Sequence, residues 1–282
     1  MAHSTRHLWL GGVLIVLSLL AANWQWGRHK QKVVETGQIV STLALPAINI
    51  NELPSDGLAE LQFRRVQASG RFDYEHEFVL RNRRLDGQPG VFVVTPLLLD
   101  DTGRAVLVNR GFIPLAQASR EKRKLFRGEP SQVQVQGIVR KPMRGRLFGP
   151  QDPQLKPGDA WRDTWLRIDP DLIRPLLPYP LLPVFVEMTA SGDPALIFDA
   201  LVEKKSGRDE LLNMSGRADA LGLKPFTSTT PLPAHVLLPP DIHRGYVVEW
   251  IFIACFIAAT TLVVHLRKSW GSWGTQQSLE RF

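Results

Sequence analysis

The sequence predicts a membrane protein in which two transmembrane helices flank a mostly antiparallel β-domain with one or two short helices. Near each end of the chain is an apolar run about as long as the roughly 20 residues that cross a hydrocarbon core as a helix. Between them, in 28–244, short alternating or apolar runs are separated by Gly, Pro and Asp turn signals, which is typical of antiparallel strands. We therefore expect a helical hairpin with a β-domain between its legs, built as either a barrel or a sandwich.

The first apolar run, 8–27, is the expected first transmembrane helix. It continues through Trp24 and Trp26 into the basic stretch RHKQK, which is typical of an anchor at the membrane surface. A cleaved signal peptide is the alternative, because a charged start, an apolar core and the small pair Ala21-Ala22 loosely fit that pattern. The Arg- and Ser-rich composition of a mitochondrial presequence does not precede the run. We expect a retained helix in a bacterial inner membrane.

The second apolar run, 245–266, is the expected second transmembrane helix, and the charges beside it predict the topology. Lys and Arg favour the cytoplasmic side, so the pair Arg267-Lys268 predicts a cytoplasmic tail at 267–282. A hairpin then places 1–7 in the cytoplasm and 28–244 in the periplasm. The charges around the first helix favour the opposite orientation, because more basic residues follow it than precede it. We follow the second helix, since long domains cross the membrane largely regardless of charge.

The central domain should contain short strands joined by turns. Pro96 falls near the middle of one expected strand and marks it as an edge or bulged strand. Asp169, followed by Pro170, is an expected helix cap for a short helix that ends near Leu176. The polar segment 200–225 is an expected exposed insertion. The expected strands are 61–72, 78–84, 91–99, 105–113, 133–140, 161–169 and 182–190, with a further short helix at 119–127.

Composition and motifs argue against several functional classes. The single cysteine, Cys255, lies inside the second expected helix, so no intrachain disulfide, CxxC pair or cysteine copper site is expected. The formal charge of +7 is more simply explained by anionic lipid head groups than by nucleic acid in a chain with two membrane spans. The stretch HEFVL at 76–80 lacks the second His of a zinc protease, and serine hydrolase and nucleotide-binding motifs are absent. We do not expect an enzyme. The stretch YEHE at 74–77 is a weak candidate for metal binding and more typical of a solvated turn.

A polar and aromatic rim opens the second expected helix. His243, Tyr246 and Trp250 are spaced i, i+3 and i+7, so a helix places them on one face. They lie at the membrane surface, where Tyr and Trp rings are enriched. An interfacial belt that only anchors the helix is one interpretation, and a binding site is the other.

Short motifs in a fixed order run through nearly the whole chain. The first helix ends in Trp-Gln, followed by Arg and Lys at helical spacing. The middle of the chain has a strand with a Gly, then Gly and Thr-Pro-Leu, then Val-Asn-Arg-Gly before a Pro, then Gly-x-x-Arg-x-Pro. His-x-x-Tyr-x-x-x-Trp opens the second helix. These positions are Trp24, Gln25, Arg28, Lys32, 66–72, Gly90, 95–97, 108–111, Pro114, Gly137, Arg140, Pro142, His243, Tyr246 and Trp250. The ordered set resembles the Surfeit locus protein 1 family, membrane proteins of cytochrome oxidase assembly. It departs from that family at Ile242, where Asn is common, and at Phe112, where Trp is usual.

The resemblance implies an assembly factor for a haem-copper terminal oxidase, which helps to deliver haem a to the catalytic subunit. His243 would be the transient haem iron ligand, since a neutral imidazole is a good axial ligand. Tyr246 and Trp250 would contact the macrocycle. Arg110 and Arg28 are weaker candidates for contact with haem propionates or a partner, and an ordinary salt bridge is the alternative for Arg110.

The expected partners are the catalytic subunit of the oxidase and membrane lipids, with a haem a synthesis enzyme as a further candidate and no nucleic acid. The alternative function is a membrane-anchored docking protein for oxidase subunits that has no cofactor of its own.

Overall fold

The computed structural model describes residues 6–85, 87–127, 132–145, 149–189 and 241–279, with the side chains of the last helix described as far as Arg267. The chain divides into a helical unit within 1–38 and 238–282 and a β-unit within 39–237. The expected insertion at 200–225 lies outside the described residues. The order of elements, a long helix, a β-domain and a second long helix, is the order predicted from the sequence.

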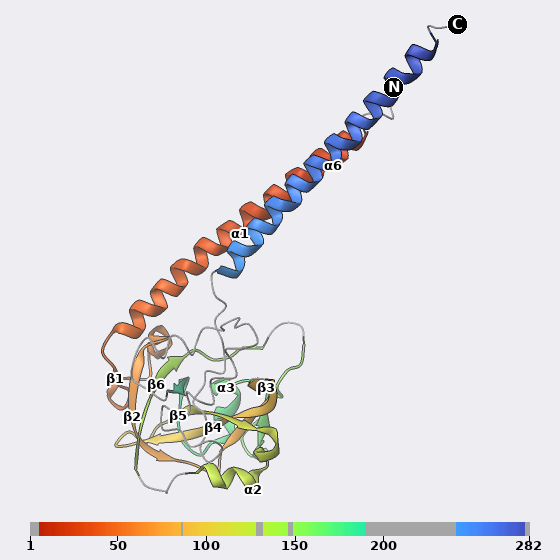
Figure 1. Cartoon of the computed structure of the whole chain (residues 1–282). Helices are drawn as coiled ribbons and strands as arrows, with labels where there is room; N and C mark the ends of the chain where they lie inside the picture. Colours follow the sequence, from red (N-terminus) through yellow and green to blue (C-terminus); the bar gives the residue numbers. More distant parts are fainter. Residues whose placement is uncertain (1–5, 86, 128–131, 146–148, 190–240, 280–282) are drawn as a thin grey trace. The chain divides into compact units, whose positions relative to one another are not determined.

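The helical unit contains α6 (Asp241–Leu279) and most of α1 (Arg6–Ala44), drawn in Figure 1 as two long ribbons side by side; the last residues of α1, 39–44, fall in the β-unit. Both contain stretches long and apolar enough to cross a membrane. Only 17% of the most apolar window of α1 and 6% of that of α6 are buried, so neither helix is packed like the core helix of a soluble domain. Helix α1 continues well beyond the predicted end of the span at 27, as far as Ala44.

The two helices pack through a narrow stripe of less exposed residues. Small side chains in this stripe let the two backbones approach closely. Gly11 shows this most clearly, because a Cβ at this position would lie 2.4 Å from Thr261 Oγ1. The stripe consists of His7, Gly11, Ile15, Ser18, Ala22 and Gln25 on α1 and His243, Val247, Trp250, Ala254, Ile257, Thr261 and His265 on α6. Contacts between opposite ends of the two sequences show that the helices run antiparallel.

The β-unit is a closed barrel, which decides between the barrel and the sandwich that the sequence left open. Its strands lie in the order β1-β2-β6-β8-β5-β4-β3-β7, and β2 also pairs with β4, so β2, β6, β8, β5 and β4 form a ring. Most pairs are antiparallel, and the exceptions are β1–β2, β3–β7 and β5–β8. The strands are β1 (Ile48–Asn49), β2 (Arg65–Phe72), β3 (Phe78–Leu85), β4 (Gln88–Leu99), β5 (Ala105–Pro114), β6 (Val133–Arg140), β7 (Thr164–Trp165) and β8 (Leu181–Met188).

The ring has the strand order of an OB-fold, a five-stranded Greek-key barrel. The five barrel strands along the chain are β2, β4, β5, β6 and β8, which are strands one to five of an OB-fold. Their order around the barrel is 1-2-3-5-4, and strands three and five, β5 and β8, are parallel. Strand β3 lies in the connection between the first and second barrel strands. Strand β7 lies in the connection between the fourth and fifth. These two connections pair with each other through β3 and β7.

Both faces of β5 are buried, which explains its continuous apolar sequence. Val106 and Val108 belong to one core cluster with side chains of β2, β6 and β8 inside the barrel. Ala105 and Leu107 belong to a second cluster on the other face, with residues of β3, β7 and α3 (Pro170–Ile173). The outer face of β4 and β5 is therefore covered by the chain's own two connections.

Most of the predicted β-elements are confirmed, and β6 has the predicted bounds. The strand predicted at 161–169 is wrong in extent, because only Thr164 and Trp165 pair, with β3. The edge-strand interpretation of Pro96 is also wrong. Strand β4 is central, and its pairing with β5 is bulged at Val93 and Val94 instead.

Both predicted short helices are found, and Asp169 is the predicted cap of its helix, because it accepts the N–H of Asp171 at the start of α3. In the segment predicted as a helix at 119–127, Ser119 accepts the N–H of Lys122 at the start of α2 (Arg120–Arg123). The described 3₁₀-helices are η1 (Ile50–Glu52), η2 (Leu58–Leu61), η3 (Leu115–Gln117), η4 (Lys124–Phe126) and η5 (Arg174–Leu176).

Candidate functional site

His243, near the start of α6, is held against α1 by Gln25. Its Nδ1 lies 2.9 Å from Gln25 Oε1. Because an amide oxygen can only accept a hydrogen bond, Nδ1 is the donor in this contact. Nε2 is then the ring nitrogen that is available to a metal, and imidazole nitrogen is a good axial ligand for haem iron. The contact therefore orients His243 in the way that metal-binding histidines are usually oriented.

The other predicted residues of this site lie at the same end of the helix pair. Trp250 is half-buried and Tyr246 is 41% exposed, so the phenol is accessible. Arg28 follows Gln25 by three residues and donates to Gln31 Oε1 at 3.0 Å, which leaves its guanidinium on the same side of α1. Four of the five predicted site residues thus belong to the helical unit.

Arg110, the fifth predicted residue, lies in the β-unit, where it is the extra residue of a β-bulge. Val93 pairs with Gly111 and Val94 pairs with Asn109, so Arg110 has no opposite residue. Gly111 has a φ of 121°, a conformation that favours glycine, and Asn109 Oδ1 accepts its N–H at 3.2 Å. The Asn-Arg-Gly motif is therefore a bulge that sets the direction of the arginine side chain.

The bulge places Arg110 against Glu77, a carboxylate that is only 1% exposed. Glu77 Oε2 accepts from Arg110 Nη1 at 3.1 Å and from Thr95 Oγ1 at 3.3 Å. Its Oε1 accepts from Arg123 Nε at 3.2 Å and from Arg127 Nη2 at 3.3 Å. A buried charge requires such pairing. The solvated turn expected at 74–77 is thus wrong for Glu77.

The guanidinium of Arg110 contacts groups of the β-unit on several sides. It donates to the carbonyl of Phe126 and lies 5.2 Å from the ring centre of Phe72 and 5.4 Å from that of Tyr74. Arg110 as a whole residue is 6% exposed. This is the ordinary salt-bridge alternative that the sequence left open for Arg110, and nothing in the geometry points to a propionate contact.

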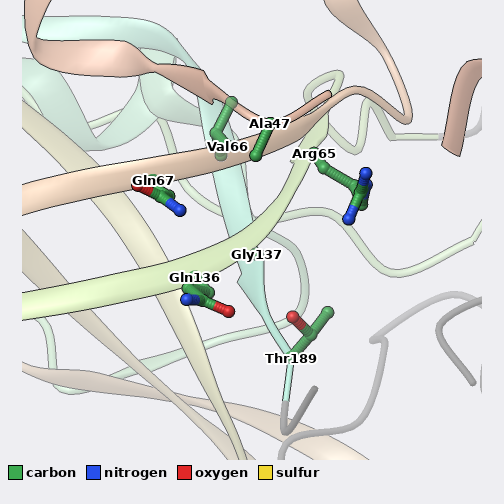
Figure 2. Close-up of a pocket in the computed structure, with 7 residues that line it drawn as sticks. All are labelled: Ala47, Arg65, Val66, Gln67, Gln136, Gly137 and Thr189. Carbon is green, nitrogen blue, oxygen red and sulfur yellow. The ribbon is translucent and has the colours of Figure 1, made fainter. Parts of the chain in front are cut away.

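A small hollow in the β-unit lies where β1, β2 and β6 meet. Figure 2 shows it between Gln67 and Gln136, with Arg65 at one side. Its volume of about 200 Å³ is below the range typical of ligand pockets, and no histidine lines it. The lining residues are Ala47, Arg65, Val66, Gln67, Gln136, Gly137 and Thr189. It is not a candidate haem site.

Residues 12–255 match the SURF1 family. The chain belongs to the SURF1 family. It is 30% identical over 189 residues to a SURF1-like protein of Monosiga brevicollis, covering 64% of this chain and 69% of that protein. It is 28% identical to Surfeit locus protein 1 of Gallus gallus, covering 51% and 52% of the two chains. It is 30% identical to the cytochrome oxidase assembly protein SHY1 of Saccharomyces cerevisiae, covering 50% and 38%.

The chain thus spans about half the length of the chicken relative and less of the yeast one. Within this SURF1 chain, the Gln25–His243 contact joins two motifs that are 218 residues apart. Sequence reasoning placed both residues at one membrane surface but missed that Gln25 is the hydrogen-bond partner of His243. The sequence signal for this contact was weak: Gln25 lies at the end of the first apolar run and His243 just before the second, which a hairpin brings to the same membrane surface.

Proposed function

We propose that this chain is an assembly factor for a haem-copper terminal oxidase, anchored in a membrane by α1 and α6. Membership of the SURF1 family supports the assembly role, because a yeast relative is named a cytochrome oxidase assembly protein. We further propose a bacterial inner membrane, a periplasmic β-unit and a binding role without catalysis. The oxidase catalytic subunit would be the main partner, and a haem a synthesis enzyme a second one.

The helix pair has the dimensions of a membrane hairpin. At 1.5 Å per residue, about 27 Å of α1 separates Gln25 from His7, and about 33 Å of α6 separates His243 from His265. The rings of His7 and His265 are 5.8 Å apart at their centres. A hydrocarbon core is about 30 Å thick, so these two polar contacts would lie at its opposite surfaces. His243 would then be at the level of the head groups, where a porphyrin can enter from the bilayer.

The observation that carries the haem proposal is the hydrogen bond between His243 and Gln25. It orients His243 so that Nε2 can bind the iron of haem a, while Tyr246 and Trp250 offer aromatic contact to the macrocycle. Bound haem would supply the redox-active iron that the oxidase requires. The chain itself would hold it transiently and exclude other ligands before transfer.

The experiment is an absorption spectrum of the full chain purified in detergent from haem-a-producing cells. Wild-type protein should carry haem with a histidine-ligand spectrum, and His243→Ala should lose most of it. Gln25→Ala should keep a reduced haem content, because the imidazole is no longer held in one orientation. His265→Ala is the matched control, since it removes the same side chain at the other end of the same helix. A wild type without haem, or a His243→Ala protein with an unchanged haem content and spectrum, would refute haem ligation by His243.

The assembly role is tested separately from haem binding. Deletion of the gene should lower both the oxidase activity and the haem a content of the membranes. Normal values for both would refute the assembly role. A loss of oxidase activity with a haem-free purified protein would instead favour the docking protein without a cofactor.

A further inference from the structure

An acidic side chain lies inside the second apolar helix, where charged residues are rare. Glu249 of α6 is exposed, and it follows His243 by about 9 Å along the helix axis. In the proposed hairpin, the contacts of His243 with Gln25 and of His7 with His265 would lie at the two membrane surfaces. Glu249 would therefore lie inside the hydrocarbon core, in the half nearer His243. A carboxylate that faces lipid there is costly, and charged side chains within membrane spans are usually paired and functional.

The two helices offer Glu249 no cation at this depth. Glu249 makes no hydrogen bond or ion pair with the residues that the structure describes, and the nearby Arg244 instead has its Nε 3.6 Å from Asp241 Oδ1. Neither 7–27 on α1 nor 250–266 on α6 contains a Lys or Arg. Irregular backbone does not enter the lipid-exposed hydrocarbon region, so a cation at this depth must be carried by another transmembrane helix. A second copy of this chain has the same two spans and offers none there either.

Glu249 points away from α1. Val247 and Trp250 are half-buried against α1, and Glu249 lies about 160° and 100° around the helix from them. Its neighbours on the outer side are spaced i, i+4, i+7 and i+11, the spacing by which one helix packs along another. They form the Glu249 face, which consists of Gly245, Glu249, Phe252 and Phe256, with Ile253 at its border.

The side chains of the Glu249 face suit a second helix. Phe252 and Phe256 are each 70% exposed, the highest exposure of any large apolar residue described on α6. A Cβ at Gly245 would have nothing within 4 Å, so the backbone of another helix can approach closely one turn before the carboxylate. The face thus combines apolar area, a point of close approach and one unpaired negative charge.

We propose that the Glu249 face is the docking surface for a transmembrane helix of another protein, which carries a Lys or Arg at the depth of Glu249. The cation would neutralise the carboxylate, and apolar side chains of the same helix would cover Phe252 and Phe256. This inference rests on the proposed membrane anchoring and is independent of haem binding. It adds to the proposed function the chemistry by which a membrane partner is recognised.

The experiment is site-specific photo-cross-linking of the full chain in its native membranes. Benzoylphenylalanine replaces Ile253, which borders the Glu249 face, or Ile251, which lies about 160° around the helix from Glu249. The two isoleucines are a matched pair, because they are 43% and 45% exposed and lie at nearly the same depth. The Ile253 probe should form an adduct with a protein whose cross-linked span contains Lys or Arg, as identified by mass spectrometry. The Ile251 probe should not form it.

The charge of Glu249 is tested in the Ile253 probe protein. Glu249→Gln should lower the adduct yield by about fivefold or more, which is the lower end of what polar contacts between model helices contribute in membranes. Glu249→Asp should keep most of the yield, because it keeps the charge. Glu249→Lys should abolish the adduct, and exchange of the partner's Lys or Arg for Glu should then restore it.

Several outcomes would overturn the docking proposal alone. These are an unchanged yield in Glu249→Gln, an equal yield from the Ile251 probe, adducts only with lipid or with a second copy of this chain, or a cross-linked span without Lys or Arg. The assembly role would still stand in each case if deletion lowers oxidase activity and haem a content. Release of the full chain from membranes by alkaline carbonate would instead refute the anchoring, and with it both proposals.

Discussion

Replacing Glu77 with Gln should destabilise the β-unit by about 3–5 kcal/mol, the usual result of removing one partner from a buried ion pair. The structure favours the lower part of this range. Arg123 would keep its second partner Asp163, and Arg127, with a side chain 20% exposed, could turn to water. Arg110 has a side chain only 7% exposed and would keep only the Phe126 carbonyl and two ring faces. A loss of about 3 kcal/mol is a change of roughly two decades in the unfolding equilibrium.

Amide hydrogen exchange in the full chain measures this change, because the amides of Val106 and Val108 lie in β5 beside the bulge. Their protection should fall by about 100-fold in Glu77→Gln. Glu121→Gln is the matched control, since Glu121 pairs with Lys124 on the exposed surface of the neighbouring helix, and its exchange should match the wild type. Adding Arg110→Met to Glu77→Gln should recover part of the loss, because the orphaned charge is then removed as well. A change of less than threefold in Glu77→Gln, or no recovery in the double variant, would refute the reasoning.

Two further variants test the helix pair and the hydrogen bond of 2.6 Å that the Tyr179 hydroxyl donates to Asp73 Oδ2 in the β-unit. Gly11→Leu should lower the thermal midpoint of the helical signal in detergent, by an overpacking cost of about 1–3 kcal/mol, because its Cβ would meet Thr261. Gly12→Leu, where nothing lies within 4 Å of the new Cβ, should not, and equal midpoints for the two variants would contradict the packing described. Because the folded-state pKa of Asp73 is lowered, its stabilising contribution is present above the unfolded pKa of about 3.9 and is lost as the pH falls through the folded value. Tyr179→Phe removes a hydrogen bond that lowers the folded-state pKa of Asp73, so this pKa should rise. During acid titration the near-UV circular dichroism of the Tyr179→Phe protein should therefore be lost at a higher pH than that of the wild type. An unchanged midpoint of the acid transition would show that Tyr179 does not stabilise the charged Asp73.

Local sequence patterns predicted the strands because each pattern has a local physical cause. The alternation in 133–140 depends only on neighbouring residues, and the strand has the predicted bounds in the structure. Closure of the barrel depends instead on pairing of β2 with β4, which no local pattern encodes. For this reason the sequence could not decide between barrel and sandwich. The short extent of β7 has the same origin, since the second core cluster holds Trp165 and Ile168 by packing rather than by strand pairing.

In the candidate site, too, contacts between residues far apart in the sequence could not be predicted from local patterns. His243 could be found from an aromatic rim at the end of an apolar run, but its partner Gln25 depends on the register of two helices at opposite ends of the chain. Glu77 was misplaced because an acidic residue in the turn before a strand is normally solvated. Its burial follows from three arginines brought together by the bulge in β5 and by the segment after it.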